Sequence, residues 1–178
     1  DIECKKINNK YVEKFTNQYI EKSFEVALDL IKKKFSNKLI NGPINKTTFL
    51  NKKFLGITEY ITKKYKIKKT GMLIYNKSLS VCPVTTHLPI KLVAKKISKK
   101  LIKEKILMVH NFYMKNLKIK PKIAVTGLNP HCESILKFNE DERIIAPAIK
   151  DMQNKKINIK GPFSADTIFS YKNRILYD

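Results

Sequence analysis

Short apolar runs and long amphipathic segments alternate along this chain of 178 residues, and the alternation limits the folds that it can adopt. Apolar residues recur at helical spacing over residues 9–35 and again over residues 100–117, with lysine and glutamate on the other faces. Runs of two to four apolar residues lie between and after these segments, as is typical of buried strands. Strands that alternate with helices of this length favour an α/β fold with largely parallel strand pairing.

Five internal strands are predicted, and most of them lead into a loop signal such as Gly, Pro or Asn. They are residues 39–40, 72–75, 79–82, 123–125 and 157–159. The last four residues, 175–178, have the pattern of the first half of a further strand. We therefore expect the chain to stop within a secondary-structure element.

Two shorter helices are predicted over residues 90–97 and 140–152. Asn139 is placed to cap the helix over 140–152, and acidic residues at 140–142 put negative charge where the helix dipole favours it. Pro147 lies inside this segment and should kink the helix or break it locally.

The chain is strongly basic, since 37 lysines and arginines against 15 acidic residues give a formal net charge of +22. Such a charge raises the hypothesis of nucleic-acid binding. Only Arg143 and Arg174 are arginine, however, whereas proteins that grip phosphates usually include arginine for its planar, bidentate fork. Lysine is spread over the whole chain together with asparagine and isoleucine, as an AT-rich coding sequence would produce. We therefore expect weak nonspecific polyanion binding and no specific nucleic-acid partner.

The apolar runs are too short to span a membrane, and the N-terminus lacks the charged-then-apolar stretch of a signal peptide. The three cysteines, Cys4, Cys82 and Cys132, form no CxxC pair, so neither a zinc ribbon nor a disulfide framework is indicated. These features predict a cytoplasmic protein without a membrane partner.

Two of the three histidines directly follow predicted strands: His87 lies in TTHLP and His131 in GLNPH. Ligand sites in open α/β sheets lie beyond the carboxyl ends of the strands, so both histidines occupy the expected rim. Two imidazoles could share a divalent metal, although a metal site needs a third ligand. The alternative is that each histidine hydrogen-bonds loop backbone, and the residues alone leave both possibilities open.

Five motifs carry a resemblance that extends over nearly the whole chain. They are LINGPINK at 39–46, GITE at 56–59, TTHLP at 85–89, GLNPH at 127–131 and GPFSADTIF at 161–169. In this order and at these separations they resemble the 4-hydroxythreonine-4-phosphate dehydrogenase family of pyridoxal phosphate biosynthesis. TTHLP together with GLNPH is the most specific part of the resemblance. The general nucleotide-binding and acyl-transfer motifs GxGxxG, GxxxxGK and GxSxG are absent.

The resemblance implies an isocitrate/isopropylmalate dehydrogenase-like fold, with two α/β domains around a cleft, and a homodimer. It implies oxidation of the C3 hydroxyl of 4-phosphohydroxy-L-threonine with NAD, after which the β-keto acid loses carbon dioxide. It also implies a divalent metal (zinc, magnesium or cobalt) held by His87, His131 and a third histidine outside this chain, and it matches Thr58 to a substrate-binding threonine. Neutral imidazoles leave the metal its full charge to polarise the substrate hydroxyl.

Two positions depart from the family pattern. Ile57 stands where the family's Gly-His-Thr-Glu motif has its histidine, which removes a hydrogen bond to charged substrate worth about 1.5–3 kcal/mol. The alternative substrate is therefore another phosphorylated hydroxy acid, such as threonate 4-phosphate. Glu133 lies one place away from an acidic residue in the loop that follows GLNPH in the family. A third alternative, a nonenzymatic basic polyanion-binding module, accounts for the charge but for none of the motifs.

The resemblance also indicates the central part of a two-domain protein. The family's N-terminal Gly/Pro-rich loop and its C-terminal substrate-binding and cofactor-binding segments have no counterpart here, so no catalytic or NAD-binding residue is assigned. We expect residues 1–45 to belong to the first domain and residues 46–178 to the second. We also expect the chain by itself to be inactive.

Overall fold

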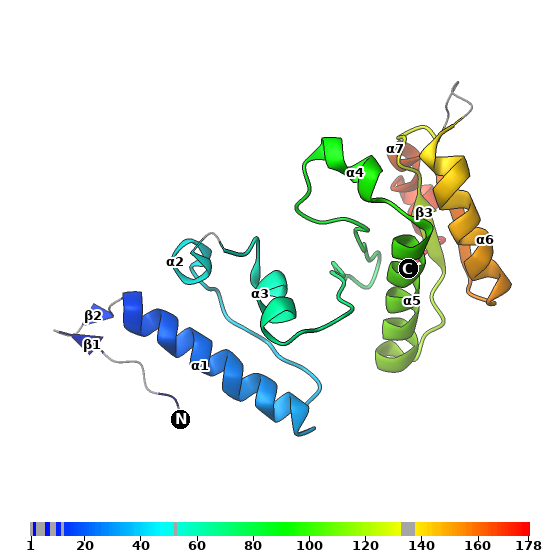
Figure 1. The fold of residues 1–178 in the computed structure, drawn as a ribbon. Coiled ribbons are helices and arrows are strands. Elements are labelled where there is room, and N and C mark those ends of the chain that lie inside the picture. The colour runs from blue at the N-terminus through cyan, green and yellow to red at the C-terminus, as the bar shows by residue number, and fades with distance from the viewer. Residues whose placement is uncertain (1, 3–5, 8–9, 12, 52, 133–137) are drawn as a thin grey trace. The chain divides into compact units, whose positions relative to one another are not determined.

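The computed structural model describes residues 2, 6–7, 10–11, 13–51, 53–132 and 138–178, and it forms two compact units (Figure 1). Unit 1 spans Asp1–Thr70 and unit 2 spans Gly71–Asp178. From the sequence, we expect a domain boundary of the whole protein near residue 45. The two units are defined within residues 1–178 only, so that boundary stays a prediction.

Unit 1 consists of a small hairpin and three helices. Strands β1 (Lys6–Ile7) and β2 (Lys10–Tyr11) pair antiparallel, and helix α1 (Glu13–Lys32) follows them. Helices α2 (Lys46–Leu50) and α3 (Ile57–Lys64) complete the unit. Helix α1 confirms the long helix predicted over 9–35, of which Asn9 and Val12 lie outside the described residues.

The core of unit 1 is aromatic. Phe24 of α1, Leu50 of α2 and Tyr60 of α3 are buried together. The ring of Phe49 lies edge-on to Tyr60 with centroids 5.0 Å apart, a geometry that aromatic rings favour over a face-to-face stack. These contacts hold α3 against α1 and α2.

The strand predicted at residues 39–40 is wrong. This segment is a loop in which Ile40 is 95% exposed and Leu39 is 38% exposed. No strand or bridge includes these two residues, and apolar character alone does not distinguish a short strand from an exposed loop.

Unit 2 carries the α/β part of the chain. Its elements, in chain order, are α4 (Ile90–Lys96), α5 (Lys99–Phe112), the π-helix η1 (Tyr113–Leu117), β3 (Ile123–Thr126), the π-helix η2 (Asp141–Ile145), α6 (Ala146–Asn154), β4 (Ile159–Phe163), α7 (Ala165–Ile168) and α8 (Tyr171–Arg174). Strands β3 and β4 pair in parallel, with Ile123 opposite Ile159. The parallel pairing and the helices at 90–97 and 100–117 confirm the sequence predictions.

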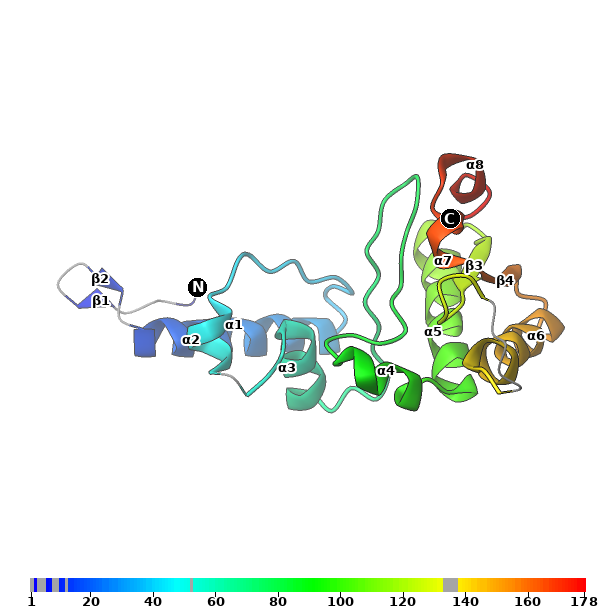
Figure 2. The ribbon, with the colours of Figure 1, turned by 90° about the horizontal axis from the view of Figure 1, so that it is seen from above.

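Helices α5 and α6 pack against each other, and α6 also packs on β4 (Figure 2). The core of unit 2 lies among these elements and contains Ile102, Ile106, Ile145, Ala148, Ile149, Met152, Ile157 and Ile159. Six of these eight residues are isoleucine, whose branched side chain packs well on strands and between close helices.

The helix predicted over 140–152 forms in two parts. Asn139 Oδ1 accepts a hydrogen bond from Glu142 N at 2.8 Å, so Asn139 caps the segment as predicted. Pro147 lies in the first turn of α6, where a missing N–H is tolerated, and the π-helix η2 precedes it. The proline therefore marks a change of helix type.

Four other strand predictions need correction. Residues 72–75 and 79–82 form only one isolated antiparallel bridge, between Ile74 and Val81. Strand β4 begins at Ile159 and not at 157. Residues 175–178 follow α8 as a turn, since Leu176 N and Tyr177 N donate to carbonyls three residues back.

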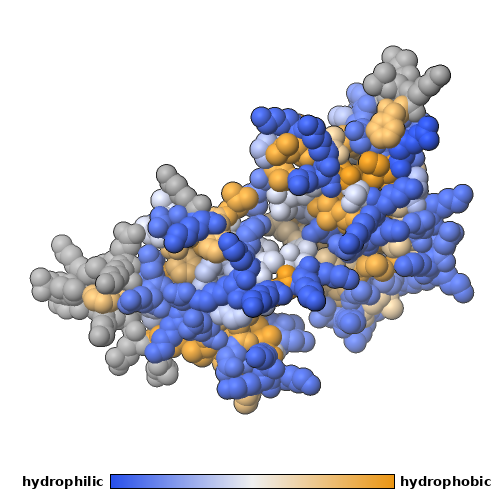
Figure 3. All heavy atoms as spheres, in the orientation of Figure 1, coloured by the Kyte–Doolittle hydropathy of each residue, from blue (hydrophilic) through white to orange (hydrophobic). Residues whose placement is uncertain are grey.

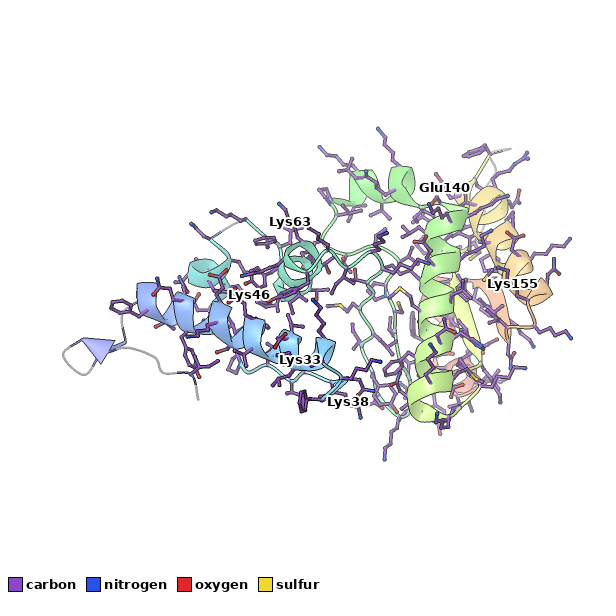
Figure 4. The ribbon with its side chains drawn as sticks, turned by 60° about the horizontal axis from the view of Figure 1, so that its bottom comes forward. Lys33, Lys38, Lys46, Lys63, Glu140 and Lys155 are labelled. Carbon is purple, nitrogen blue, oxygen red and sulfur yellow. The ribbon has the colours of Figure 1, made fainter. Side chains whose placement is uncertain are left out.

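Hydrophilic side chains dominate the face shown in Figure 3, with apolar residues scattered among them. The lysines labelled in Figure 4 are all exposed and come from both units: Lys33, Lys38, Lys46, Lys63 and Lys155. No helix within the described part of the chain combines the length and apolar character needed to cross a membrane.

Candidate functional site

Two of the five motifs meet beyond the carboxyl ends of β3 and β4. GLNPH directly follows β3, and GPFSADTIF begins inside β4 and continues into α7. Because the strands are parallel, both motifs emerge at the same edge of the sheet. This is the edge at which open α/β sheets place their ligands.

The backbone of GLNPH is tied directly to the loop after β4. Pro130 O accepts hydrogen bonds from Ala165 N and Ser164 Oγ, each at 2.8 Å. Asn129 Oδ1 accepts a hydrogen bond from His131 N at 3.1 Å, which closes a turn around Pro130. The two loops therefore form one structure around His131.

His131 faces a carboxylate from the second loop. Its Nδ1 lies 3.2 Å from Asp166 Oδ2, and the imidazole side chain is 71% exposed. A carboxylate that holds Nδ1–H leaves Nε2 with its lone pair free for a ligand, an arrangement common behind metal-binding histidines.

The Asp166 carboxylate is itself held by its neighbours. A hydrogen bond from Ser164 Oγ to Oδ1 is the largest influence, and it holds the pKa of Asp166 below its ordinary value together with the nearby His131. Asp166 therefore remains an ionised acceptor at neutral pH.

A buried carboxylate on the other side shapes the GLNPH loop. Asp141 Oδ1 accepts a hydrogen bond from Leu128 N at 2.6 Å, and Oδ2 accepts one from Asn129 N at 3.3 Å. Asp141 is only 5% exposed. The sequence places this residue in the first turn of a helix, where its charge would act on the helix dipole, so its loop-holding role was missed.

Gly127 is required by the close packing of this loop. A Cβ atom at this position would lie 2.3 Å from Cys132 Sγ and 3.0 Å from Asp141 Oδ1. The first distance is too short for a carbon atom and the second is tight, so any larger residue would push Cys132 and Asp141 away from the loop. Burial raises the pKa of the Cys132 thiol, so this side chain acts as packing at neutral pH.

The structure places His87 in an exposed loop of the same unit, with a left-handed backbone (φ 56°). Among the described residues, no group of three or more His, Cys, Asp and Glu could hold a metal ion. The shared metal site of His87 and His131 stays a prediction. The donor chemistry of His131 fits a divalent metal, because its second nitrogen is free and a carboxylate orients the ring.

Thr58 belongs to unit 1, whereas His131 belongs to unit 2, so the contact of Thr58 with substrate stays a prediction. It is exposed in the first turn of α3, while its neighbour Ile57 packs against the buried core of Phe24, Leu50 and Tyr60. The aliphatic side chain at position 57 therefore has a packing role in this chain. Glu133 lies outside the described residues.

Ser164, Asp166 and Asp141 are residues to which the sequence assigned no role at this site. Ser164 and Asp166 lie inside the quoted GPFSADTIF motif, so a signal for them was present. Asp141 had no such signal, because its partners are backbone N–H groups of another segment.

The amino-acid sequence of the chain matches a known protein family. The family model for "Pyridoxal phosphate biosynthetic protein PdxA" matches residues 2–178. The chain belongs to the PdxA family. This confirms the resemblance carried by the five motifs.

Curated relatives of this PdxA-family chain are named 4-hydroxythreonine-4-phosphate dehydrogenase. One from Sulfurihydrogenibium sp. is 36% identical over 154 residues, which is 84% of this chain and 48% of the relative. Another, from Wigglesworthia glossinidia brevipalpis, is 36% identical over 170 residues, or 93% and 49% of the two chains. The chain thus spans about half the length of the curated relatives it matches.

Solved PdxA-family structures share the fold. The 4-hydroxythreonine-4-phosphate dehydrogenase from Burkholderia phymatum superposes with a TM-score of 0.72 at 27% identity, covering 93% of this chain and 50% of that one. The enzyme from Klebsiella pneumoniae gives 0.66 at 29% identity, covering 77% and 42%. Family members are named as dehydrogenases, which are oxidoreductases acting on a CH–OH group.

Proposed function

We propose that the whole protein oxidises the C3 hydroxyl of 4-phosphohydroxy-L-threonine in pyridoxal phosphate biosynthesis. The observation that carries the proposal is His131, which Asp166 orients at the carboxyl edge of a parallel sheet in a chain that matches the PdxA family throughout. The names of the relatives give the substrate class.

The reaction removes a hydride from C3 and a proton from the hydroxyl group on the same carbon. The C3–H bond breaks with its electron pair, which NAD would accept, and the hydroxyl proton leaves as the ketone forms. The resulting β-keto acid then loses carbon dioxide. A divalent metal (zinc, magnesium or cobalt) would supply Lewis acidity that polarises the hydroxyl.

The chain's own residues contribute orientation. Asp166 holds Nδ1 of His131, so Nε2 points away from the carboxylate and is free to bind. Asp141 and Gly127 hold the backbone of the loop that carries His131. His87, from the TTHLP loop, is the second residue proposed to hold the metal, and Thr58 is proposed to contact substrate. A cytoplasmic homodimer is the proposed working form.

The experiment is an assay of the whole protein with NAD and 4-phosphohydroxy-L-threonine, in which formation of NADH and release of carbon dioxide are measured together. His131→Ala should abolish both signals. Lys155→Ala, an exposed residue after α6, serves as a control and should leave them unchanged. Turnover that persists in His131→Ala would remove this residue from the site.

Ile57 favours a second candidate substrate, threonate 4-phosphate. In the whole protein, Ile57→His should raise kcat/KM for 4-phosphohydroxy-L-threonine about tenfold if one charge-assisted hydrogen bond is restored. Ile61→His is a matched control, because Ile61 lies one turn later in α3 and packs on the same core. A loss of activity on both substrates in Ile57→His alone would mean that the site is built around the aliphatic side chain.

A further inference from the structure

Unit 1 contains a groove beside α3. All the residues that line it lie between positions 53 and 70, so the groove belongs to unit 1 alone. Its volume is about 370 Å³, within the range of about 300–1,000 Å³ that is usual for small-molecule sites. Thr58, which is proposed to contact substrate, lies on its wall. A substrate that contacts Thr58 therefore has room to bind in this groove.

The wall of the groove is anchored to the aromatic core of unit 1. Phe54 lines the groove, and its ring lies edge-on to that of Tyr60 with centroids 5.4 Å apart. Lys63 Nζ lies 5.6 Å from the centroid of the Phe54 ring, which is the distance of a cation–π contact. Thr62 Oγ1 donates a hydrogen bond of 2.6 Å to Thr58 O within α3. These contacts tie the lining residues to the folded core.

The groove carries charges of both signs. Lys53 and Lys63 line it as cations, and Glu59 supplies one carboxylate. Neither lysine forms an ion pair with any residue that the structure describes. Charged groups of a ligand are recognised by groups of the opposite charge, and such hydrogen bonds are the strong ones. The lining therefore matches a small ligand that carries anionic groups together with one cationic group.

The Glu59 carboxylate is unpaired. Its Oε2 atom is buried and accepts no hydrogen bond from any described residue. Buried polar atoms are almost always hydrogen-bonded, and an ionised carboxylate can only accept, so this oxygen points to a donor supplied by a ligand. The side chain as a whole is half-buried and lines the groove. A ligand in the groove can therefore reach the carboxylate.

The position of Glu59 in α3 suggests another role, that of a helix cap. A glutamate at the third helical position can reach back to the backbone N–H of the N-cap residue, which here is Gly56. The carboxylate does lie against Gly56, because a Cβ atom at that position would be 2.8 Å from Glu59 Oε2. Yet Gly56 N does not donate to it. Gly56 thus leaves room for the carboxylate without pairing with it.

We propose that Glu59 binds the ammonium group of the substrate and thereby selects 4-phosphohydroxy-L-threonine over threonate 4-phosphate. The inference rests on the proposed function, from which it takes the substrate class. The two substrates differ at C2, where the first carries an ammonium group and the second a hydroxyl group. Both groups can donate to Glu59, but only the ammonium brings a positive charge to balance the carboxylate. Glu59 therefore favours the amino substrate, whereas Ile57 favours the other one.

The test uses two probes that lack the C3 hydroxyl and differ only in the ammonium group: O-phospho-L-homoserine, which has it, and 4-phosphooxybutanoate, which does not. Binding of each probe to the whole protein is measured by calorimetry, so the readout does not depend on turnover. The wild-type protein should bind the amino probe about tenfold or more tightly than the other. Glu59→Gln keeps the shape of the side chain and removes its charge. It should reduce this preference to about twofold without weakening the binding of 4-phosphooxybutanoate.

Glu25→Gln makes the same chemical change in α1, outside the groove, and should keep the wild-type preference. Gly56→Ala displaces the Glu59 carboxylate through its added Cβ, so it should also lower the preference, and it decides the test if Glu59→Gln does not fold. Equal binding of both probes by the wild-type protein would overturn the proposal. So would a preference that is retained in Glu59→Gln, or an equal loss of both probes in that variant when folded, which would show a structural role. A wild-type protein that binds neither probe would overturn the proposed substrate class itself.

Discussion

His131 Nδ1 lies 3.2 Å from Asp166 Oδ2, and this contact joins the loop that follows β3 to the loop that follows β4. Both residues are exposed, so the contact has little weight for stability. The contact instead sets the orientation and the tautomer of the imidazole, because a carboxylate beside one ring nitrogen decides which nitrogen carries the proton and which is free to bind.

Asp166→Ala should reduce the population of the His131 tautomer that is protonated at Nδ1, because the acceptor of that proton is lost. The nitrogen chemical shifts of the imidazole ring report this population directly. Asp151→Ala, at a half-exposed position in α6, is the control and should leave the ring unchanged. An unaltered tautomer in Asp166→Ala would show that the contact does not orient His131.

Asp141→Asn should destabilise unit 2 and loosen the GLNPH loop. An amide offers one acceptor oxygen where the carboxylate offers two, so one of the N–H groups of Leu128 and Asn129 loses its partner. A buried donor without a partner costs about 1–3 kcal/mol in the free energy of unfolding. Glu142→Gln makes the same chemical change one residue along at an exposed position, and denaturant unfolding should find it near neutral.

Met152→Ala should lower the free energy of unfolding by about 2–5 kcal/mol, because it leaves a cavity among the buried side chains of α5 and α6. Met152 is 1% exposed, whereas Met114 in η1 is 43% exposed. Met114→Ala is therefore the matched control, and its effect should stay within about 0.5 kcal/mol. Equal effects in urea unfolding would place the core of unit 2 elsewhere.

Asp151→Asn should destabilise the chain at neutral pH but not in acid. Lys103 of α5 donates a 2.7 Å hydrogen bond to Asp151 of α6 and lowers the pKa of this carboxyl. A lowered folded-state pKa gives stability that is present above the ordinary value of about 3.9 and is lost as pH falls through the folded-state value. The difference in Tm between the two proteins should therefore shrink below about pH 4.

The same comparison in a Lys103→Met background tests the cause. With the Lys103 ammonium removed, the pH-dependent effect of Asp151→Asn on Tm should become smaller, since only the weaker influences of Lys99 and Lys155 on the Asp151 pKa remain. A pH-dependent difference of undiminished size would assign the effect to another group.

The local patterns of the sequence determined most of the elements in unit 2. Helical spacing predicted α4 and α5, Asn139 was identified as a cap, and the apolar run that forms β3 ends at the loop carrying His131. Such features depend on neighbours within a few residues, so the sequence displays them directly. The five motifs likewise identified the PdxA family before any contact was known.

Contacts between distant segments were decided by the tertiary structure. The sequence placed Asp141 in a helix turn, but it is the fold that buries its carboxylate against the backbone of residues 128–129. The same is true of Asp166 beside His131, 35 positions away, and of Asp178 between Ser80 and Lys122. The runs at 39–40 and 175–178 have strand-like patterns without forming strands, because a strand exists only where another backbone pairs with it.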